Sequence, residues 1–155
     1  ENFKQEFELR VDWEILSEFA LTAQIGRTLE KTGASASFFK KELLMEVFSK
    51  MKVWLNVRLG FSLNLMMSEY SFKYNGLQYR ADIVVFDKNR EIKLLVECKA
   101  PSVEIDREVI EQGIRYNRSL NVKYILFTNG VSLCGYRRRD GSSEYEAISD
   151  MTEIK

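Results

Sequence analysis

Two short segments of this chain, residues 81–86 and 94–100, are apolar on both faces of an extended strand, and they constrain the fold most. Strands of this kind lie in the interior of a sheet that is covered on both sides. Each segment also carries charge where the pattern asks for an apolar side chain, Asp82 in the first and Glu97 with Lys99 in the second. A buried carboxylate without compensation is costly, so these side chains need a cation or a metal as partner.

Periodicity along the rest of the chain predicts helices first and then a meander of strands. Helical spacing predicts one helix over residues 12–31 and a second from Ser37 to a point before Gly60. Beyond Gly60 the apolar period changes to two, and Asn75-Gly76 is a strong hairpin turn signal. The meander that these signals predict has three strands, residues 68–74, 78–86 and 92–99.

A third helix and further strands follow the meander. Ser102 can cap a helix that runs to about Leu120. Glu104 and Asp106 would then lie in its first turn, where the helix dipole favours anions. Alternating segments predict the last strands, residues 122–128 and 131–137, and a short edge strand over residues 142–148.

This order of elements predicts one α/β domain. Its centre is a mixed sheet, formed by the three-strand meander, a helix and further strands, and helices flank the sheet. The length of 155 residues is the usual size of a single domain. We expect residues 36–140 to form the core and residues 1–35 to form a helical extension.

Composition excludes several kinds of chemistry. The chain has no His, which removes imidazole bases, Ser–His and Cys–His nucleophiles and His-ligated zinc. Two cysteines, Cys98 and Cys134, cannot form a four-thiolate metal site, and their scarcity favours a reducing compartment. Lys+Arg and Asp+Glu both count 23, so nucleic-acid binding would have to use local basic patches. There is no secretory leader and no apolar run near the roughly 20 residues that span a bilayer, so a cytoplasmic protein is expected.

The spacing of the charged residues places them together. If the turn after residue 86 centres between residues 89 and 90, Asp82 lies directly opposite Glu97, with Cβ atoms roughly 4.5–5.5 Å apart. Lys99 emerges on the same face as Glu97, whereas Cys98 points into the opposite layer. Two adjacent carboxylates repel each other unless a divalent cation lies between them, and oxygen ligands without His are what Mg²⁺ or Mn²⁺ prefers. Lys99 beside such a metal could position or deprotonate a water and stabilise negative charge on a phosphate.

Gln112 and Tyr116 add two polar groups on the third predicted helix. They are four residues apart and therefore neighbours on one helical face, where they flank the apolar stripe that should pack on the sheet. Gln112 could therefore contact the metal site or a scissile phosphate.

The acidic residue, the Glu-x-Lys strand and the Gln-Tyr pair together resemble the PD-(D/E)XK nuclease superfamily, and the pair matches the QxxxY element of its RecB-like branch. The residues that carry this resemblance are Asp82, Glu97-Cys98-Lys99 and residues 112–116. More narrowly, residues 79–85, 96–102 and 127–130 are similar to the N-terminal nuclease domain of type I restriction enzyme R subunits. The likeness covers residues 79–137 well and residues 38–74 in their order of elements.

This resemblance implies a restriction-endonuclease-like core and Mg²⁺-dependent endonucleolytic cleavage of DNA phosphodiester bonds. By position, Asp82 and Glu97 would be the metal ligands, and the carbonyl of Cys98 would help to hold the metal. Lys99 would orient or activate the attacking water.

The resemblance also gives supporting roles in the site to Gln112 and Tyr116. It implies DNA as the substrate, and a translocase or methylase assembly in host defence as the partner. One departure from the family pattern is that Ala81 replaces the usual Pro before Asp82, which is a common variation.

The family also carries a Glu early in the helix before the meander, and this chain has none at the aligned position near residues 36 and 37. Glu42 and Glu46, at the edge of that helix's apolar stripe, could take its place. Without a third carboxylate, the same fold could serve as a catalytically inactive nucleic-acid-binding or assembly module.

The arginine run at residues 137–139 has two interpretations, a phosphate-contacting patch or a solvated turn.

Overall fold

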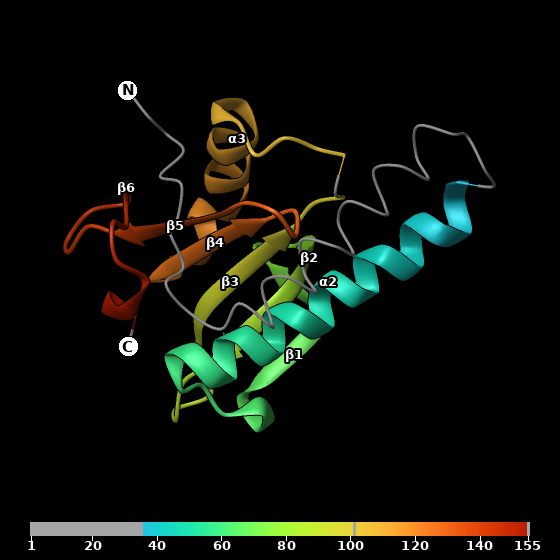
Figure 1. Cartoon of the computed structure of the whole chain (residues 1–155). Coiled ribbons are helices and arrows are strands. Elements are labelled where there is room, and N and C mark those ends of the chain that lie inside the picture. Colours follow the sequence, from blue (N-terminus) through green and yellow to red (C-terminus); the bar gives the residue numbers. More distant parts are fainter. Residues whose placement is uncertain (1–35, 101, 155) are drawn as a thin grey trace.

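The computed structural model describes residues 36–100 and 102–154, which form an α/β structure (Figure 1). Within these residues a six-stranded mixed sheet lies at the centre, with one helix against each face. The predicted α/β class with a central mixed sheet is therefore confirmed. The helix predicted over residues 12–31 lies outside the described residues. None of the helices in the described part of the chain is long and apolar enough to span a membrane.

The strands of the described residues lie in the sheet in the same order as in the sequence. They are β1 (Met66–Tyr74), β2 (Leu77–Phe86), β3 (Ile92–Cys98), β4 (Tyr124–Thr128), β5 (Leu133–Arg138) and β6 (Tyr145–Ala147), with short 3₁₀ turns η1 (Leu63–Leu65) before β1 and η3 (Met151–Glu153) after β6. Neighbouring strands are antiparallel except β3 and β4, which are parallel. A parallel pair needs a crossover connection. Helix α3 (Arg107–Asn117) and the 3₁₀ turn η2 (Arg118–Leu120) provide it.

Helix α2 (Ala36–Leu59) covers the first face of the sheet (Figure 1). Phe48, Met51 and Leu55 are three and four residues apart, and they are buried in one cluster with side chains of β2, β3 and β4. Gly60 ends the helix in a left-handed conformation, with a φ of +72° and its N–H donating to the carbonyl four residues back at 3.1 Å. The prediction that this helix ends before Gly60 is confirmed.

The three-strand meander has the predicted register. Asn75 and Gly76 both have positive φ, 50° and 76°, as the tight turn between β1 and β2 requires. The cross-strand partners in β2 and β3 are those that a turn centred between residues 89 and 90 predicts: Ile83 and Val96, Val84 and Leu95, and Val85 and Leu94. All six side chains are 0% exposed, so β2 and β3 are the central strands that their two-sided apolar pattern predicted.

The start of the third helix differs from the prediction. The N-cap of α3 is Asp106 and not Ser102, and the Asp106 carboxylate accepts a hydrogen bond from the Val109 N–H at 2.9 Å. Ile105, directly before the cap, and Ile110 are both 1% exposed in one cluster, an arrangement known as a hydrophobic staple. Because Ile105 must be buried there, the helix begins after it and not at Ser102.

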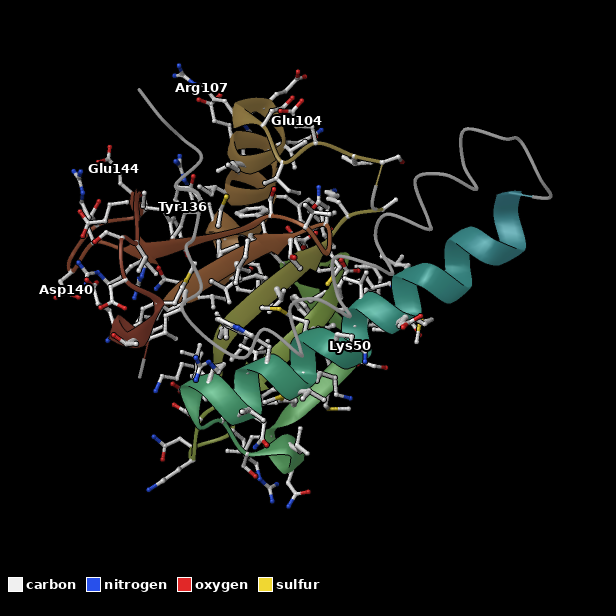
Figure 2. The ribbon with its side chains drawn as sticks, in the orientation of Figure 1. Lys50, Glu104, Arg107, Tyr136, Asp140 and Glu144 are labelled. Carbon is white, nitrogen blue, oxygen red and sulfur yellow. The ribbon has the colours of Figure 1, made fainter. Side chains whose placement is uncertain are left out.

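Helix α3 covers the second face of the sheet over β4 and β5. Tyr136 of β5 lies on this face (Figure 2), and its ring packs against Phe127 of β4 with the centroids 5.9 Å apart. Glu104 and Arg107 lie at the outer end of α3 in the same view, and both are exposed. Glu104 therefore precedes the helix, and its predicted place in the first turn is wrong.

Candidate functional site

Asp82 lies on β2 at the point where backbone pairing with β3 ends. The pairing runs as far as Ile83 and Val96. Beyond them, Oδ2 of Asp82 accepts a hydrogen bond from the Cys98 N–H at 2.7 Å. Burial raises the pKa of Asp82, while the Cys98 N–H and the nearby Lys99 ammonium lower it. The carboxylate is thus held at the end of β3 by a backbone donor.

The regular alternation of side chains breaks at the same level of the sheet. Ala81 shares a buried cluster with Val84, whereas Ile83 packs with α2 on the other face. In a regular strand Ala81 and Ile83 would lie on one face. On β1, Ser68 pairs with Ile83 and Tyr70 pairs with Ala81, so Glu69 lies opposite Asp82. Glu69 has a φ of +51°, which is uncommon for a residue other than glycine. Strands β1 and β2 are therefore both distorted at the level of Asp82.

Glu97 lies partly buried on β3, on the face opposite α2. Its neighbours Val96 and Cys98 both pack in the cluster with α2, so the Glu97 side chain lies on the other face. Burial raises the pKa of Glu97 to about 7, and the Asp82 charge contributes to the rise, while the Lys99 ammonium lowers it. The charge of Asp82 thus opposes the ionisation of Glu97. Asp82 and Lys99 are therefore close enough to Glu97 to affect its ionisation.

Cys98 and Lys99 complete the end of β3. The Cys98 side chain is 6% exposed and packs with α2, in the layer opposite Glu97, as predicted. Burial raises the pKa of the Cys98 thiol well above its usual value, so this thiol is not a nucleophile. The Lys99 N–H donates to the Thr128 carbonyl at 2.8 Å, which keeps the ends of β3 and β4 together.

Asn117, at the end of α3, is a site residue that the sequence analysis did not identify. Its side chain is 2% exposed, and its Nδ2 donates to the Gly113 carbonyl at 2.9 Å. The same side chain also interacts with the Glu97 carboxylate, and this interaction lowers the Glu97 pKa against the effect of burial. The available signal was helical spacing, because Asn117 lies seven residues after the buried Ile110 and so on the same face of α3.

Gln112 and Tyr116 lie on the exposed surface of α3. Tyr116 is 48% exposed, and its ring packs against Tyr79 of β2 with the centroids 5.2 Å apart. Gln112 is exposed as well. Tyr116 thus contacts β2, whereas Asn117 of α3 interacts with the Glu97 carboxylate.

Among the described residues, α2 does not supply a third carboxylate beside Asp82 and Glu97. Glu46 has an exposed side chain, and the side chain of Glu42 lies outside the described residues. In the described part of the chain, no group of three His, Cys, Asp or Glu side chains is placed to hold a metal ion. The candidate centre in these residues therefore consists of two carboxylates, Asp82 and Glu97.

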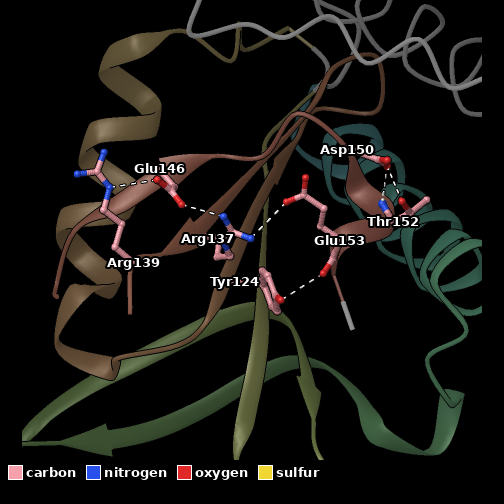
Figure 3. A network of polar contacts seen from close by, with 7 residues as sticks. All are labelled: Tyr124, Arg137, Arg139, Glu146, Asp150, Thr152 and Glu153. Atoms are coloured by element: carbon pink, nitrogen blue, oxygen red, sulfur yellow. Dashed lines mark hydrogen bonds and ion pairs between the residues drawn. The ribbon is translucent and has the colours of Figure 1, made fainter. Parts of the chain in front are cut away.

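Acidic side chains neutralise much of the arginine run at the end of β5 (Figure 3). Arg137 donates to Glu146 at 2.9 Å and to Glu153 at 3.3 Å. Arg139 donates to the same Glu146 at 3.1 Å, and these bonds lower the Glu146 pKa. The contacts favour the interpretation of this run as a solvated structural feature over a phosphate-contacting patch.

The fold and the site together define an α/β domain with a mixed sheet and a partly buried carboxylate pair beside a lysine. Residues 50–151 match the family of the type I restriction enzyme R protein N terminus, and the chain belongs to this family. The matched segment contains every predicted site residue from Asp82 to Tyr116. The narrower resemblance, to the N-terminal domain of type I restriction enzyme R subunits, is therefore confirmed. No curated protein matches the chain.

Proposed function

We propose that the chain is a Mg²⁺-dependent endodeoxyribonuclease domain that hydrolyses DNA phosphodiester bonds on a restriction-endonuclease-like core. The observation that carries this proposal is the desolvated carboxylate pair of Asp82 and Glu97, with the Lys99 ammonium beside it. Membership in a family of restriction-enzyme domains supports the proposal.

The donor set fits a hard divalent cation. Asp82 and Glu97 are both desolvated, and the charge of Asp82 raises the pKa of Glu97, so ionising both is costly without a cation. Mg²⁺ in proteins usually binds one or two carboxylates and keeps waters or substrate phosphates as its other ligands. Two carboxylates therefore fit Mg²⁺ or Mn²⁺, and the Cys98 carbonyl would be a further oxygen ligand.

The site residues would have separate roles in metal binding and in the hydrolysis of the phosphodiester bond. Mg²⁺ held by Asp82 and Glu97 would supply charge neutralisation at the scissile phosphate and a water of lowered pKa. The Cys98 N–H fixes the Asp82 carboxylate, so this ligand is oriented before DNA arrives. The Lys99 ammonium would orient the attacking water or stabilise negative charge on the phosphate in the transition state.

In this proposal the remaining predicted residues would contact DNA. Gln112 and Tyr116 are exposed on α3 and would support the site by contacting the substrate. The domain would act in the cytoplasm, within an assembly that contains a translocase or a methylase, as the R-protein family suggests.

Cleavage of supercoiled plasmid tests the proposal. With Mg²⁺ or Mn²⁺ the wild type is expected to nick or linearise the plasmid, and Asp82→Ala and Lys99→Ala are expected to abolish cutting with unchanged circular dichroism. Glu108→Gln removes an exposed negative charge and is the matched control for Asp82→Ala. Lys88→Ala removes an exposed positive charge and is the matched control for Lys99→Ala. Both controls should cut like the wild type. Cutting that survives in Asp82→Ala or Lys99→Ala would remove that residue from the mechanism.

A second candidate function is a catalytically inactive nucleic-acid-binding or assembly module on the same fold. It is favoured by the finding that the described residues bring together two acidic ligands and not three. It predicts DNA binding that weakens with salt and ignores Mg²⁺, with no change of melting temperature when Mg²⁺ is added. A rise in melting temperature with Mg²⁺ that is lost in Asp82→Ala decides against it.

A further inference from the structure

Asn117 has an unusual environment for an amide. With Thr128 and Asn129, it is one of three buried polar side chains among the described residues. Thr128 and Asn129 accept backbone N–H groups and so close the turn after β4. The Asn117 side chain makes no such cap, although η2 begins directly after it. Because burying an amide is costly without hydrogen bonds, its partners indicate its role.

Gly113 allows this part of α3 to approach the sheet closely. A Cβ added at Gly113 would lie 2.3 Å from a carbon of the Phe127 ring, so no side chain fits there unless the ring moves. Phe127 on β4 is the register partner of Glu97 on β3. Gly113 and Asn117 are four residues apart and share one face of the helix. The helix therefore rests on these two strand residues, with Gly113 at Phe127 and Asn117 at Glu97.

The helix itself orients the Asn117 amide. Its Nδ2 donates to the Gly113 carbonyl at 2.9 Å, which fixes the rotation of the side chain. An amide nitrogen carries two hydrogens. The second hydrogen can therefore face the Glu97 carboxylate, whose pKa the Asn117 side chain lowers.

We propose that Asn117 is a positioning residue, which holds the Glu97 carboxylate in place for a divalent cation, and that Gly113 sets the distance over which it acts. The inference rests on the proposed metal site. The Asp82 carboxylate has a fixed donor in the Cys98 N–H at 2.7 Å, and Asn117 would be the corresponding donor for Glu97. Groups that hydrogen-bond metal ligands typically contribute roughly 10- to 100-fold to metal affinity.

Mn²⁺ binding to the full chain, without DNA, tests this inference independently of catalysis. Affinity is measured by isothermal titration and by loss of the paramagnetic resonance signal of free Mn²⁺. Asn117→Leu keeps the size of the side chain but removes the donor, and it is expected to weaken binding about tenfold or more. Asn89→Leu changes an exposed residue in the turn at the other end of β2 and β3, and as the matched control it should bind like the wild type. Glu97→Gln should lose high-affinity binding.

A second pair of variants carries the test if Asn117→Leu does not fold. Gly113→Ala should displace α3 and weaken Mn²⁺ binding, and adding Phe127→Leu should make room for the new methyl and restore it. Affinity that is unchanged in Asn117→Leu and Gly113→Ala, but lost in Glu97→Gln, overturns the role of Asn117 and leaves the metal site standing. Equal affinity in the wild type and Glu97→Gln overturns the metal site and this inference together.

Discussion

The substitution Glu97→Gln tests the partly buried carboxylate pair directly, because it removes the charge and keeps the shape. Burial and the Asp82 charge raise the pKa of Glu97 from 4.5 to about 7. A carboxyl whose pKa is higher in the folded than in the unfolded state contributes its full stabilisation at a pH below the unfolded pKa. For Glu97 this stabilisation is lost as the pH rises through about 7. Without metal, Glu97→Gln should therefore be more stable than the wild type at high pH and similar to it at low pH.

The size of this effect follows from the shift in pKa. One pKa unit corresponds to about 1.4 kcal/mol. The rise from 4.5 to about 7 therefore corresponds to roughly 3 kcal/mol when Glu97 is fully ionised. Relaxation of the site and entry of water reduce this figure, so we expect Glu97→Gln to gain about 1–3 kcal/mol of unfolding free energy at high pH.

Urea unfolding in EDTA, at a pH near 4.5 and again near 8.5, measures the difference between the two proteins. Glu108→Gln removes an exposed carboxylate from α3 and is the control, which should show no such pH dependence. The reasoning is refuted if Glu97→Gln is the less stable protein at high pH, or if the difference does not change with pH. Excess Mg²⁺ should reverse the ranking at high pH, because the ion binds the ionised carboxylate of the wild type.

Two further substitutions test other parts of the structure. Asp106→Ala should cost about 1 kcal/mol of unfolding free energy, because the Val109 N–H loses its capping acceptor. An unchanged urea midpoint would contradict the assignment of Asp106 as the N-cap. Arg137→Ala should change the urea midpoint little, because its ion pairs with Glu146 and Glu153 are exposed, and it should leave DNA affinity unchanged. A several-fold loss of DNA affinity would instead place this arginine on a phosphate.

The central sheet could be predicted from the sequence because its signals are local. The Asn75-Gly76 turn and the alternation of apolar residues fix how β1 pairs with β2, and the next turn fixes β2 against β3. In a hairpin the turn type and the loop length set the register, so the two turns define both pairings. This register ends at Ile83 and Val96 and brings Asp82 and Glu97 to the same end of the β2–β3 pair.

The start of α3 and the role of Asn117 could not be predicted in this way, because both depend on contacts between distant parts of the chain. Ser102 and Asp106 are both suitable caps by residue type, and the burial of Ile105 against the sheet decides between them. Asn117 reaches the site because Gly113 brings α3 close to β4, a distance that no local pattern encodes.

Strand β1 forms one edge of the sheet in the described residues, and its interruption at Glu69 affects how the sheet meets other chains. A long, regular edge strand offers its unpaired N–H and C=O groups to a strand of another molecule. The positive φ of Glu69 divides the nine residues of β1, and the charged side chains of Glu69 and Lys73 are exposed along it. The distortion that accompanies the Asp82 carboxylate therefore also protects the open edge against pairing between copies of the chain.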